Sequence, residues 1–142
     1  MRIVIASDHA GFALKAALAA DLAARGMSVE DLGPETGDEP VDYPEYGRRC
    51  AEAVAEGRAE RGILVCGSGI GISIAANRVA GVRCALVHDH LSARLAREHN
   101  DANMIAFGGR LTGIETARDA LATFLETPFA GGRHAARVAQ LG

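Results

Sequence analysis

The chain has 142 residues, of which 49% are apolar and 23% are charged, and its formal net charge is −3 at pH 7. This length predicts a single domain over residues 1–142, with roughly two-thirds of the unfolded surface buried. The slight excess of acid gives no reason to expect nucleic-acid binding. With no apolar run of about 18 residues and no signal-peptide core after Met1, we expect a cytoplasmic protein without membrane association.

Short apolar runs rich in β-branched residues alternate along the chain with longer, alanine-rich amphipathic runs. Alternation of this kind is typical of a parallel sheet with helices on both faces. We therefore expect an α/β fold, a doubly wound, Rossmann-like sheet of five parallel strands with flanking helices and a C-terminal helix. The predicted strands are Arg2–Ser7 and residues 27–32, 62–66, 83–87 and 103–107. The predicted helices are Phe12–Ala24 and residues 46–59, 70–79, 91–99, 114–125 and 133–140.

Residues capable of chemistry follow several of the predicted strands. The first strand leads to Asp8 and His9, the third ends at Cys66, the fourth leads to residues 88–90 and the fifth to residues 108–110. Ligands of doubly wound sheets bind outside the carboxyl ends of the strands. These residues are therefore the first candidates for a functional site.

Cys66 stands directly before the segment GSGIG, where a buried strand gives way to a glycine loop and a helix. Glycines let the backbone approach a ligand closely, and successive N–H groups at a helix N-terminus attract anions. The same field would favour a thiolate, so the loop suits both a base and an oxyanion hole. A small buried apolar residue is the competing interpretation, because free cysteines are often buried. Cys50 and Cys84 are expected to be free thiols as well.

The sequence lacks the residues that other functions of such a loop require. A cysteine phosphatase needs an arginine about six residues after its cysteine, where this chain has Ile72. The glycine spacing is not that of a dinucleotide fingerprint, and the Gly-Lys-Ser/Thr of a Walker loop is missing. A receiver domain would need an aspartate where Cys66 stands. His88, Asp89 and His90 resemble metal ligands, but neighbours at a strand end point in different directions, so we expect no metal. Asp89 or His90 is also suited to cap the next helix.

Two further signals lie in the C-terminal half of the chain. His99 is at the predicted end of a helix, where the helix dipole favours an imidazolium, or it is a surface histidine beside Asn100 as a C-cap. Arg133 and Arg137 stand four residues apart, which on a helix forms either a two-pronged anion clamp or a solvated face.

Five motifs taken together resemble one family. SDHAGF, DYP, CGSGIGISIAANR, REHNDANMIAFGGR and FAGGRHAARV occur in this order and cover the chain nearly end to end. They are similar to those of the type B ribose-5-phosphate isomerases, a family that also contains galactose-6-phosphate isomerase subunits. The resemblance implies a sugar-phosphate isomerase of the non-oxidative pentose phosphate pathway that needs neither metal nor cofactor. It also implies active sites between two subunits of a homodimer or a dimer of dimers.

The resemblance assigns the chemistry to the cysteine loop. Cys66 matches the base that takes the C2 proton of the open-chain aldose and returns a proton at C1. The enediolate would lie against backbone N–H groups of the loop that contains Gly67, Gly69 and Gly71. General base catalysis of this kind contributes ~10²–10⁴-fold.

The resemblance also assigns residues that handle the sugar. Ser68 and His99 match the pair that opens the furanose ring, which has no free carbonyl to acidify the C2 proton. Asp8 and Tyr43 match sugar-contacting positions. Asn100 matches the residue that holds the enediolate end of the substrate.

The phosphate-binding set implied by the resemblance is His9, Arg110, Arg133 and Arg137. Arginine suits this task because its fork binds phosphate oxygens in pairs. One branch of the family has a glutamate base at the position of Ile72 instead of a cysteine, so this chain is placed in the cysteine branch. Erythrulose 4-phosphate, allose 6-phosphate and galactose 6-phosphate stay open as substrates, as does a non-catalytic phosphosugar-binding subunit.

Overall fold

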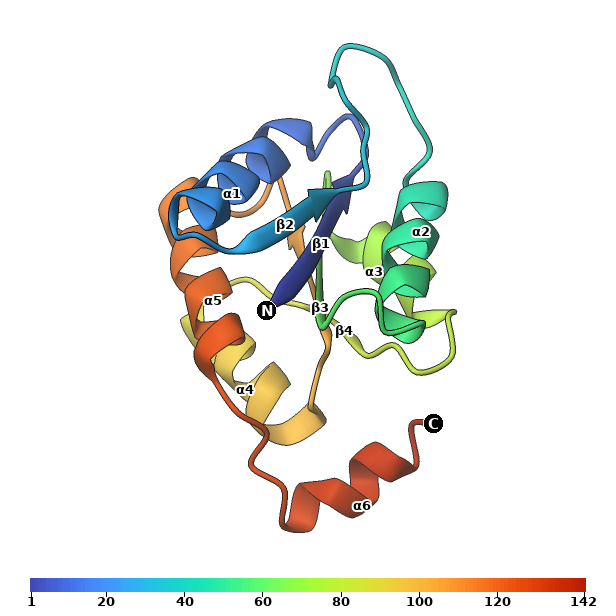
Figure 1. Cartoon of the computed structure of the whole chain (residues 1–142), viewed down its shortest axis with the longest axis vertical. Coiled ribbons are helices and arrows are strands. Elements are labelled where there is room, and N and C mark those ends of the chain that lie inside the picture. Colours follow the sequence, from blue (N-terminus) through green and yellow to red (C-terminus); the bar gives the residue numbers. More distant parts are fainter.

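A computed structural model describes residues 1–142 and contains one five-stranded parallel sheet. The strand order is β2-β1-β3-β5-β4 (Figure 1). The α/β fold predicted from the sequence is confirmed. The strands are β1 (Arg2–Ser7), β2 (Ser28–Asp31), β3 (Arg61–Cys66), β4 (Cys84–Leu86) and β5 (Met104–Gly108). The helices are α1 (Phe12–Ala24), α2 (Tyr43–Ala55), α3 (Ile70–Asn77), α4 (His90–Asn100), α5 (Ile114–Glu126) and α6 (Arg133–Ala139).

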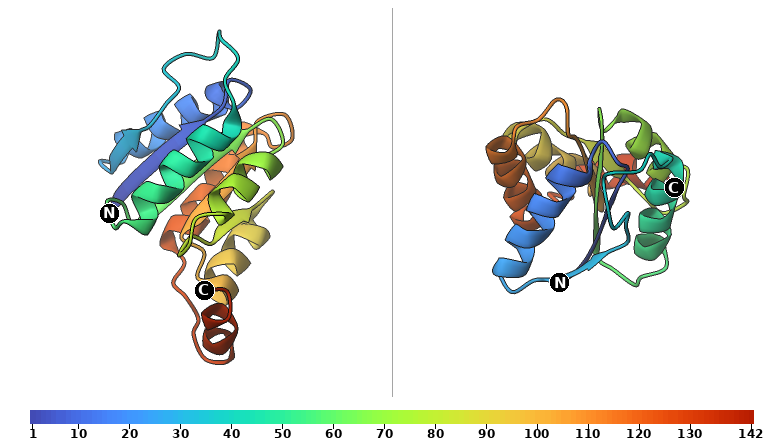
Figure 2. Two further views of the ribbon diagram at one scale, coloured as in Figure 1. Left: turned by 90° about the vertical axis from the view of Figure 1, so that its right-hand side faces the viewer. Right: turned by 90° about the horizontal axis from the view of Figure 1, so that it is seen from above.

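The centre of the sheet is buried on both faces. Ile63 of β3 pairs with Ile5 of β1 on one side and with Ile105 of β5 on the other, and all three are fully buried. Helices α1, α4 and α5 cover one face, and α2 and α3 cover the other (Figure 2). The strands therefore end in a rigid layer, which suits them to hold functional groups in fixed positions.

Several element boundaries differ from the prediction, and three elements, α2, β2 and β4, illustrate the differences. Helix α2 begins at Tyr43, three residues before the predicted start, because Asp42 takes the extended N-cap conformation and Pro44 fits the first helical turn. It ends at Ala55 because Gly57, with φ +76°, turns the chain away. Strand β2 is shorter than predicted and largely exposed, as an edge strand, instead of being buried on both faces. Strand β4 shortens to three residues at the other edge.

The parallel sheet has two ends that differ in content, which we call the carboxyl edge and the amino edge. Strands β1, β3 and β5 all deliver their last residues to the carboxyl edge. Helix α4 runs back from that edge and delivers His99 and Asn100 to the amino edge, where β5 starts. Helix α6 packs beside α4 at this second edge and buries no residue (Figure 1). None of the helices of the chain, α1 to α6, has the length and apolar character needed to cross a membrane.

Candidate active site

The carboxyl edge contains an open pocket of about 540 Å³. It forms where the segments that follow β1, β3 and β5 meet the first turn of α2. The pocket collects most of the candidates that follow strands in the sequence. Its lining residues are Asp8, His9, Ala10, Tyr43, Cys66, Gly67, Ser68, Ile70, Gly71, Arg110 and Leu111.

The Cys66 side chain sits at the bottom of the glycine loop, with only 4% of the residue exposed. The loop turns back over the sulfur because Gly69 adopts φ +78°, which glycine reaches without steric cost. The Gly69 N–H consequently donates to Cys66 Sγ over 3.1 Å. A hydrogen bond to sulfur next to a helix N-terminus favours negative charge on that atom.

The same loop contributes further residues with backbone N–H groups to the lining of the pocket. The Ile70 N–H donates to Ser68 Oγ over 3.1 Å, which leaves the Ser68 hydroxyl proton free to donate elsewhere. The N–H groups of Gly67, Ser68 and Gly71 donate to no other group of the chain. Three unused donors beside a thiol form an anion-binding concavity.

Two glycines allow the loop to approach the sheet this closely. A Cβ atom built on Gly69 would lie 2.6 Å from Leu86 Cδ1 and 2.8 Å from the carbonyl carbon of Phe107. A Cβ atom on Gly108 would lie 2.6 Å from the Ser68 carbonyl oxygen. Any side chain at either position would therefore push the loop away from the end of β3.

The residues after β1 face the loop across the pocket. Asp8 is 7% exposed, and its Oδ1 accepts the Gly11 N–H over 2.9 Å. His9 Nδ1 lies 3.1 Å from the Val41 backbone nitrogen and 3.3 Å from the Val41 carbonyl oxygen, so the backbone of Val41 holds the ring in place. Both side chains are thus held by backbone groups at the edge of the pocket.

Arg110 and Tyr43 close the sides of the pocket. The Arg110 N–H donates to the Gly67 carbonyl over 3.0 Å, and its guanidinium lies beside Gly67 without an ion pair in the chain. The Tyr43 ring lies against Gly71, where a Cβ atom would be 2.6 Å from the ring carbons. An uncompensated cation at the pocket suits an anionic ligand.

The remaining candidates lie at the amino edge. The rings of His99 and His134 stack with their centroids 4.2 Å apart, and Arg133 and Arg137 stand exposed on the same short helix as His134. Partial desolvation, followed by the charges of His99, Arg133 and Arg137, lowers the pKa of His134. The charges among these causes are all positive except that of Glu98, and a gathering of positive charge attracts an anion.

Asn100 is not the C-cap of α4, which corrects one of the two sequence interpretations of His99. It is the last helical residue, and Asp101 follows in the left-handed conformation as the cap. The HND sequence places Asn and Asp side by side, and both residue types tolerate that conformation. Only the folded chain distinguishes between them.

Within one chain, the structure does not bring the predicted site residues together. Cys66 and Ser68 lie at the carboxyl edge, whereas His99 lies at the amino edge. Asn100, Arg133 and Arg137 are at the amino edge as well. His134 was not among the residues predicted for the site. Its position inside the GGRHAAR motif was the only signal in the sequence that pointed to it.

The segment after β4 has a structural role in the chain. Asp89 caps α4 by accepting the Ser92 N–H over 2.8 Å, and this bond lowers the pKa of Asp89. His90 Nδ1 lies 2.9 Å from Thr123 Oγ1 and 3.2 Å from Asp119 Oδ2, which ties α4 to α5. No three histidine, cysteine or acidic side chains gather as metal ligands, here or elsewhere in the chain.

A buried thiol that accepts a backbone N–H, in a pocket also lined by a carboxylate and by a guanidinium free of ion pairs, is suited to proton transfer on an anionic ligand. The model of the ribose/galactose isomerase family matches residues 3–141. The chain belongs to this family, and it is an isomerase of the aldose–ketose class.

Relatives of established name are similar over nearly their whole length. Ribose-5-phosphate isomerase B of Escherichia coli is 45% identical over 96% of this chain and 91% of its own. A D-erythrulose-4-phosphate isomerase of Pectobacterium atrosepticum is 39% identical over 100% and 93%. The solved ribose-5-phosphate isomerase B of Clostridium thermocellum superposes with a TM-score of 0.98 at 48% identity, over 100% of this chain and 95% of that one.

Proposed function

We propose that this chain interconverts D-ribose 5-phosphate and D-ribulose 5-phosphate through an enediolate, with Cys66 as the base and without metal or cofactor. The observation that carries the proposal is the loop itself. Cys66 Sγ accepts the Gly69 N–H, and three further N–H groups of the same loop have no acceptor in the chain. A thiolate and an enediolate are both stabilised by such a loop.

In the isomerisation step, the Cys66 thiolate takes the C2 proton of the open-chain aldose, and the electron pair of the C–H bond forms the enediolate. The N–H groups of Gly67, Ser68 and Gly71 stabilise the oxygen that becomes negative. Cys66 then returns a proton to C1, while the C2 hydroxyl proton passes to O1 and C2 becomes the carbonyl. No atom is gained or lost.

Ring opening precedes this step and needs an acid and a base. In the proposal, His99 and Ser68 move a proton from the anomeric hydroxyl to the ring oxygen. The free Ser68 hydroxyl proton supports its part in the transfer. Asp8 and Tyr43 orient the sugar hydroxyls, and Asn100 holds the enediolate end of the substrate.

The phosphate end is assigned to His9, Arg110, Arg133 and Arg137. Val41 engages His9 Nδ1 and leaves Nε2 for the ligand, and Arg110 is free of ion pairs. Arg133 and Arg137 add the positive potential of the amino edge. Arginine forks bind phosphate oxygens in pairs, so the set suits a dianion.

The separation of the two edges supports an active site shared between two subunits. A second copy of this chain in a homodimer would bring its amino edge to the carboxyl-edge pocket of the first. Large apolar side chains stand exposed at that pocket, with Ile70 at 50% and Leu111 at 62%. Exposed apolar groups of this size mark contact surfaces between proteins.

A four-carbon substrate is the second candidate. The relative from Pectobacterium named for D-erythrulose 4-phosphate is 39% identical over the whole chain. A tetrose 4-phosphate cannot close a furanose ring because its O4 carries the phosphate. Turnover of a tetrose phosphate with no turnover of ribose 5-phosphate would favour this candidate.

The test of the base is isomerisation of ribose 5-phosphate in the presence of EDTA, for the wild type and for Cys66→Ala. We expect full wild-type activity in chelator and a loss of ~10²–10⁴-fold in kcat for Cys66→Ala, with substrate binding retained. Cys84→Ala, which removes another buried thiol, is the matched control and keeps its activity. A fully active Cys66→Ala enzyme, or turnover that depends on metal, contradicts the proposal.

The test of the shared site uses hybrid dimers. Cys66→Ala and His99→Ala chains are co-expressed with different affinity tags, and the doubly tagged dimers are purified. One site then carries both substitutions and the other carries neither, so we expect about half of the wild-type kcat per dimer. Hybrids as inactive as the two parents would show that each site is built from one chain.

A further inference from the structure

The turn that ends α4, residues His99 to Asp101, is held in an unusual way. We call it the HND turn. Asp101 adopts φ 45° and ψ 44°, and it is the only residue other than glycine with a positive φ. This conformation disfavours residues with a Cβ atom, so it persists only where the surroundings stabilise it.

Arg97 stabilises the turn from inside the protein. The residue is only 4% exposed, and its guanidinium donates to Asp101 Oδ1 over 2.8 Å and to the Ala102 carbonyl over 2.7 Å. A third bond of 3.1 Å reaches the Thr127 carbonyl after α5. Arg97 therefore anchors the turn to the α5 side of the sheet.

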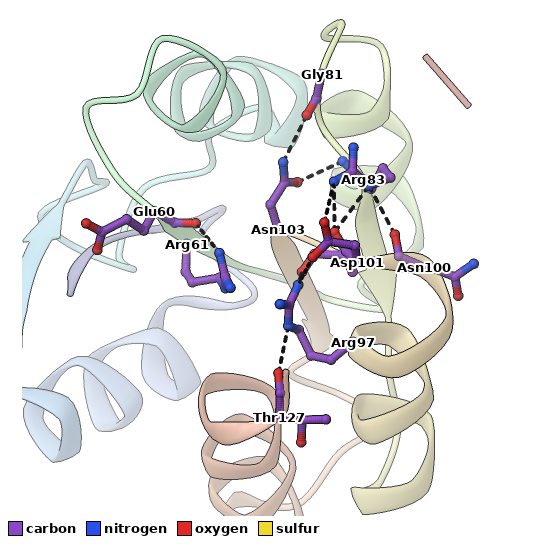
Figure 3. A network of polar contacts seen from close by, with 10 residues as sticks. Glu60, Arg61, Gly81, Arg83, Arg97, Asn100, Asp101, Asn103 and Thr127 are labelled. Atoms are coloured by element: carbon purple, nitrogen blue, oxygen red, sulfur yellow. Dashed lines mark hydrogen bonds and ion pairs between the residues drawn. The ribbon is translucent and has the colours of Figure 1, made fainter. Parts of the chain in front are cut away.

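Arg83 stabilises the turn from the other side. It donates to the Asn100 carbonyl over 3.0 Å and to the Asp101 carbonyl over 2.9 Å (Figure 3). Asn103 fixes the backbone of Arg83 by accepting its N–H over 2.8 Å, and it also donates to the Gly81 carbonyl over 2.9 Å. The turn is thus held between the start of β4 and the end of α5.

This arrangement exceeds what ending a helix requires. Helices α1 and α2 end before Gly26 and Gly57, whose φ values of +78° and +76° need no side-chain support. At α4, two arginines fix the backbone instead. Both act on carbonyl groups and on the Asp101 carboxylate, and the Asn100 side chain is left pointing away from them (Figure 3).

We propose that Arg83 and Arg97 are positioning residues, which fix the HND turn so that His99 and Asn100 are presented in one orientation to the pocket of the partner subunit. The inference rests on the proposed shared site. Its physical basis is preorganisation, because a displacement of about 1 Å in a group that contacts substrate can cost ~10²-fold in rate. Neither arginine contacts the substrate.

The first test compares Arg83→Gln and Arg83→Lys with the wild type, with Arg94→Gln as the matched control. Arg94 is an exposed arginine of α4, and its Nε lies 3.9 Å from Glu98 Oε2. We expect kcat of Arg83→Gln to fall about ten- to a hundredfold while KM changes less than about threefold. Arg83→Lys recovers part of the loss, and Arg94→Gln changes neither constant. Unchanged kcat in Arg83→Gln overturns the inference.

Asp101→Gly tests the shape of the turn separately from its ion pair with Arg97. Glycine adopts the left-handed conformation freely, so the helix still ends at this place and the fold is kept. The variant loses the carboxylate that receives Arg97, and we expect kcat, measured well below the thermal midpoint of the variant, to fall at least about fivefold. Wild-type kcat in Asp101→Gly would show that a correctly shaped turn is sufficient, and it would overturn the positioning role of the Arg97–Asp101 ion pair.

Hybrid dimers decide which site the substitution damages. A chain with Arg83→Gln paired with a Cys66→Ala chain keeps one intact site, so we expect about half of the wild-type kcat. The same chain paired with His99→Ala has both sites damaged and stays near the activity of the parents. The reverse pattern would place the Arg83 effect in its own chain's pocket and overturn the inference. If the Cys66→Ala and His99→Ala hybrid is itself inactive, the shared site fails, and the inference fails with it.

Discussion

The carboxyl edge and the amino edge of this sheet differ in how tightly their residues are packed. At the carboxyl edge, Gly69 and Gly108 let the backbone approach to distances at which no Cβ atom fits, and Cys66 is almost fully buried. At the amino edge, α6 buries no residue and leaves Arg133 and Arg137 in solvent. The chain therefore places Cys66, the proposed base, in a tightly packed layer and its long cationic side chains on a loosely packed helix.

The difference agrees with the tasks proposed for the two edges. Proton transfer needs reacting atoms within hydrogen-bond distance, so its geometry must be set by packed backbone. Phosphate recognition depends on charge and on flexible guanidinium forks, which adjust to the ligand after it arrives. The HND turn is the exception at the amino edge, since Arg83 and Arg97 make it rigid.

The largest expected effect comes from filling the carboxyl edge. Gly69→Ala puts a Cβ atom 2.6 Å from Leu86 Cδ1 on a residue with φ +78°. We expect activity to fall by at least ~10²-fold, because the loop must move away from Cys66, and stability to fall by about 1–3 kcal/mol. Gly113→Ala, with nothing within 4 Å of the added atom, is the control in both the kinetic assay and urea unfolding. Equal behaviour of the two variants would show that the loop is not tightly constrained.

The amino edge is expected to respond in the opposite way. Arg133→Ala combined with Arg137→Ala removes two exposed cations from a helix without buried residues. We expect KM for ribose 5-phosphate to rise about ten- to a hundredfold, because charge-assisted bonds to phosphate are lost, while the unfolding midpoint stays unchanged. Arg78→Ala, which removes an exposed arginine at the end of α3, leaves KM unaltered. A destabilised double variant would contradict the view of α6 as a loosely packed helix.

The smallest effect sharpens the contrast between two thiols. Cys84, at the amino end of β4, resists ionisation, because burial raises the pKa of its thiol to about 12. The unfolded thiol ionises at about 8.5, so stability is complete below that pH and declines as the pH rises toward 12. We expect Cys84→Ala to flatten the decline between pH 9 and 10 by up to ~1.4 kcal/mol per pH unit. Urea unfolding at several pH values measures it, and an unchanged slope would mean that Cys84 ionises freely in the folded protein.

Much of this protein was determined by local sequence. The alternating apolar and amphipathic runs established the α/β class, since burial on both faces demands continuous apolar strands. The glycines after Cys66 established the tight loop, because few other residues allow it. The rule that sites form outside the carboxyl ends of the strands groups Asp8 and Cys66 from the sequence alone, and both line one pocket.

Other features were decided only by tertiary structure. Asp101 caps α4 instead of Asn100, and the turn that it forms is held by Arg83, which reaches it from the segment before β4. The distance between His99 and Cys66 in one chain depends on the direction in which α4 crosses the sheet, which no motif reports. Motifs describe what neighbouring residues do together, whereas strand order and helix direction determine which edge of the molecule each motif occupies.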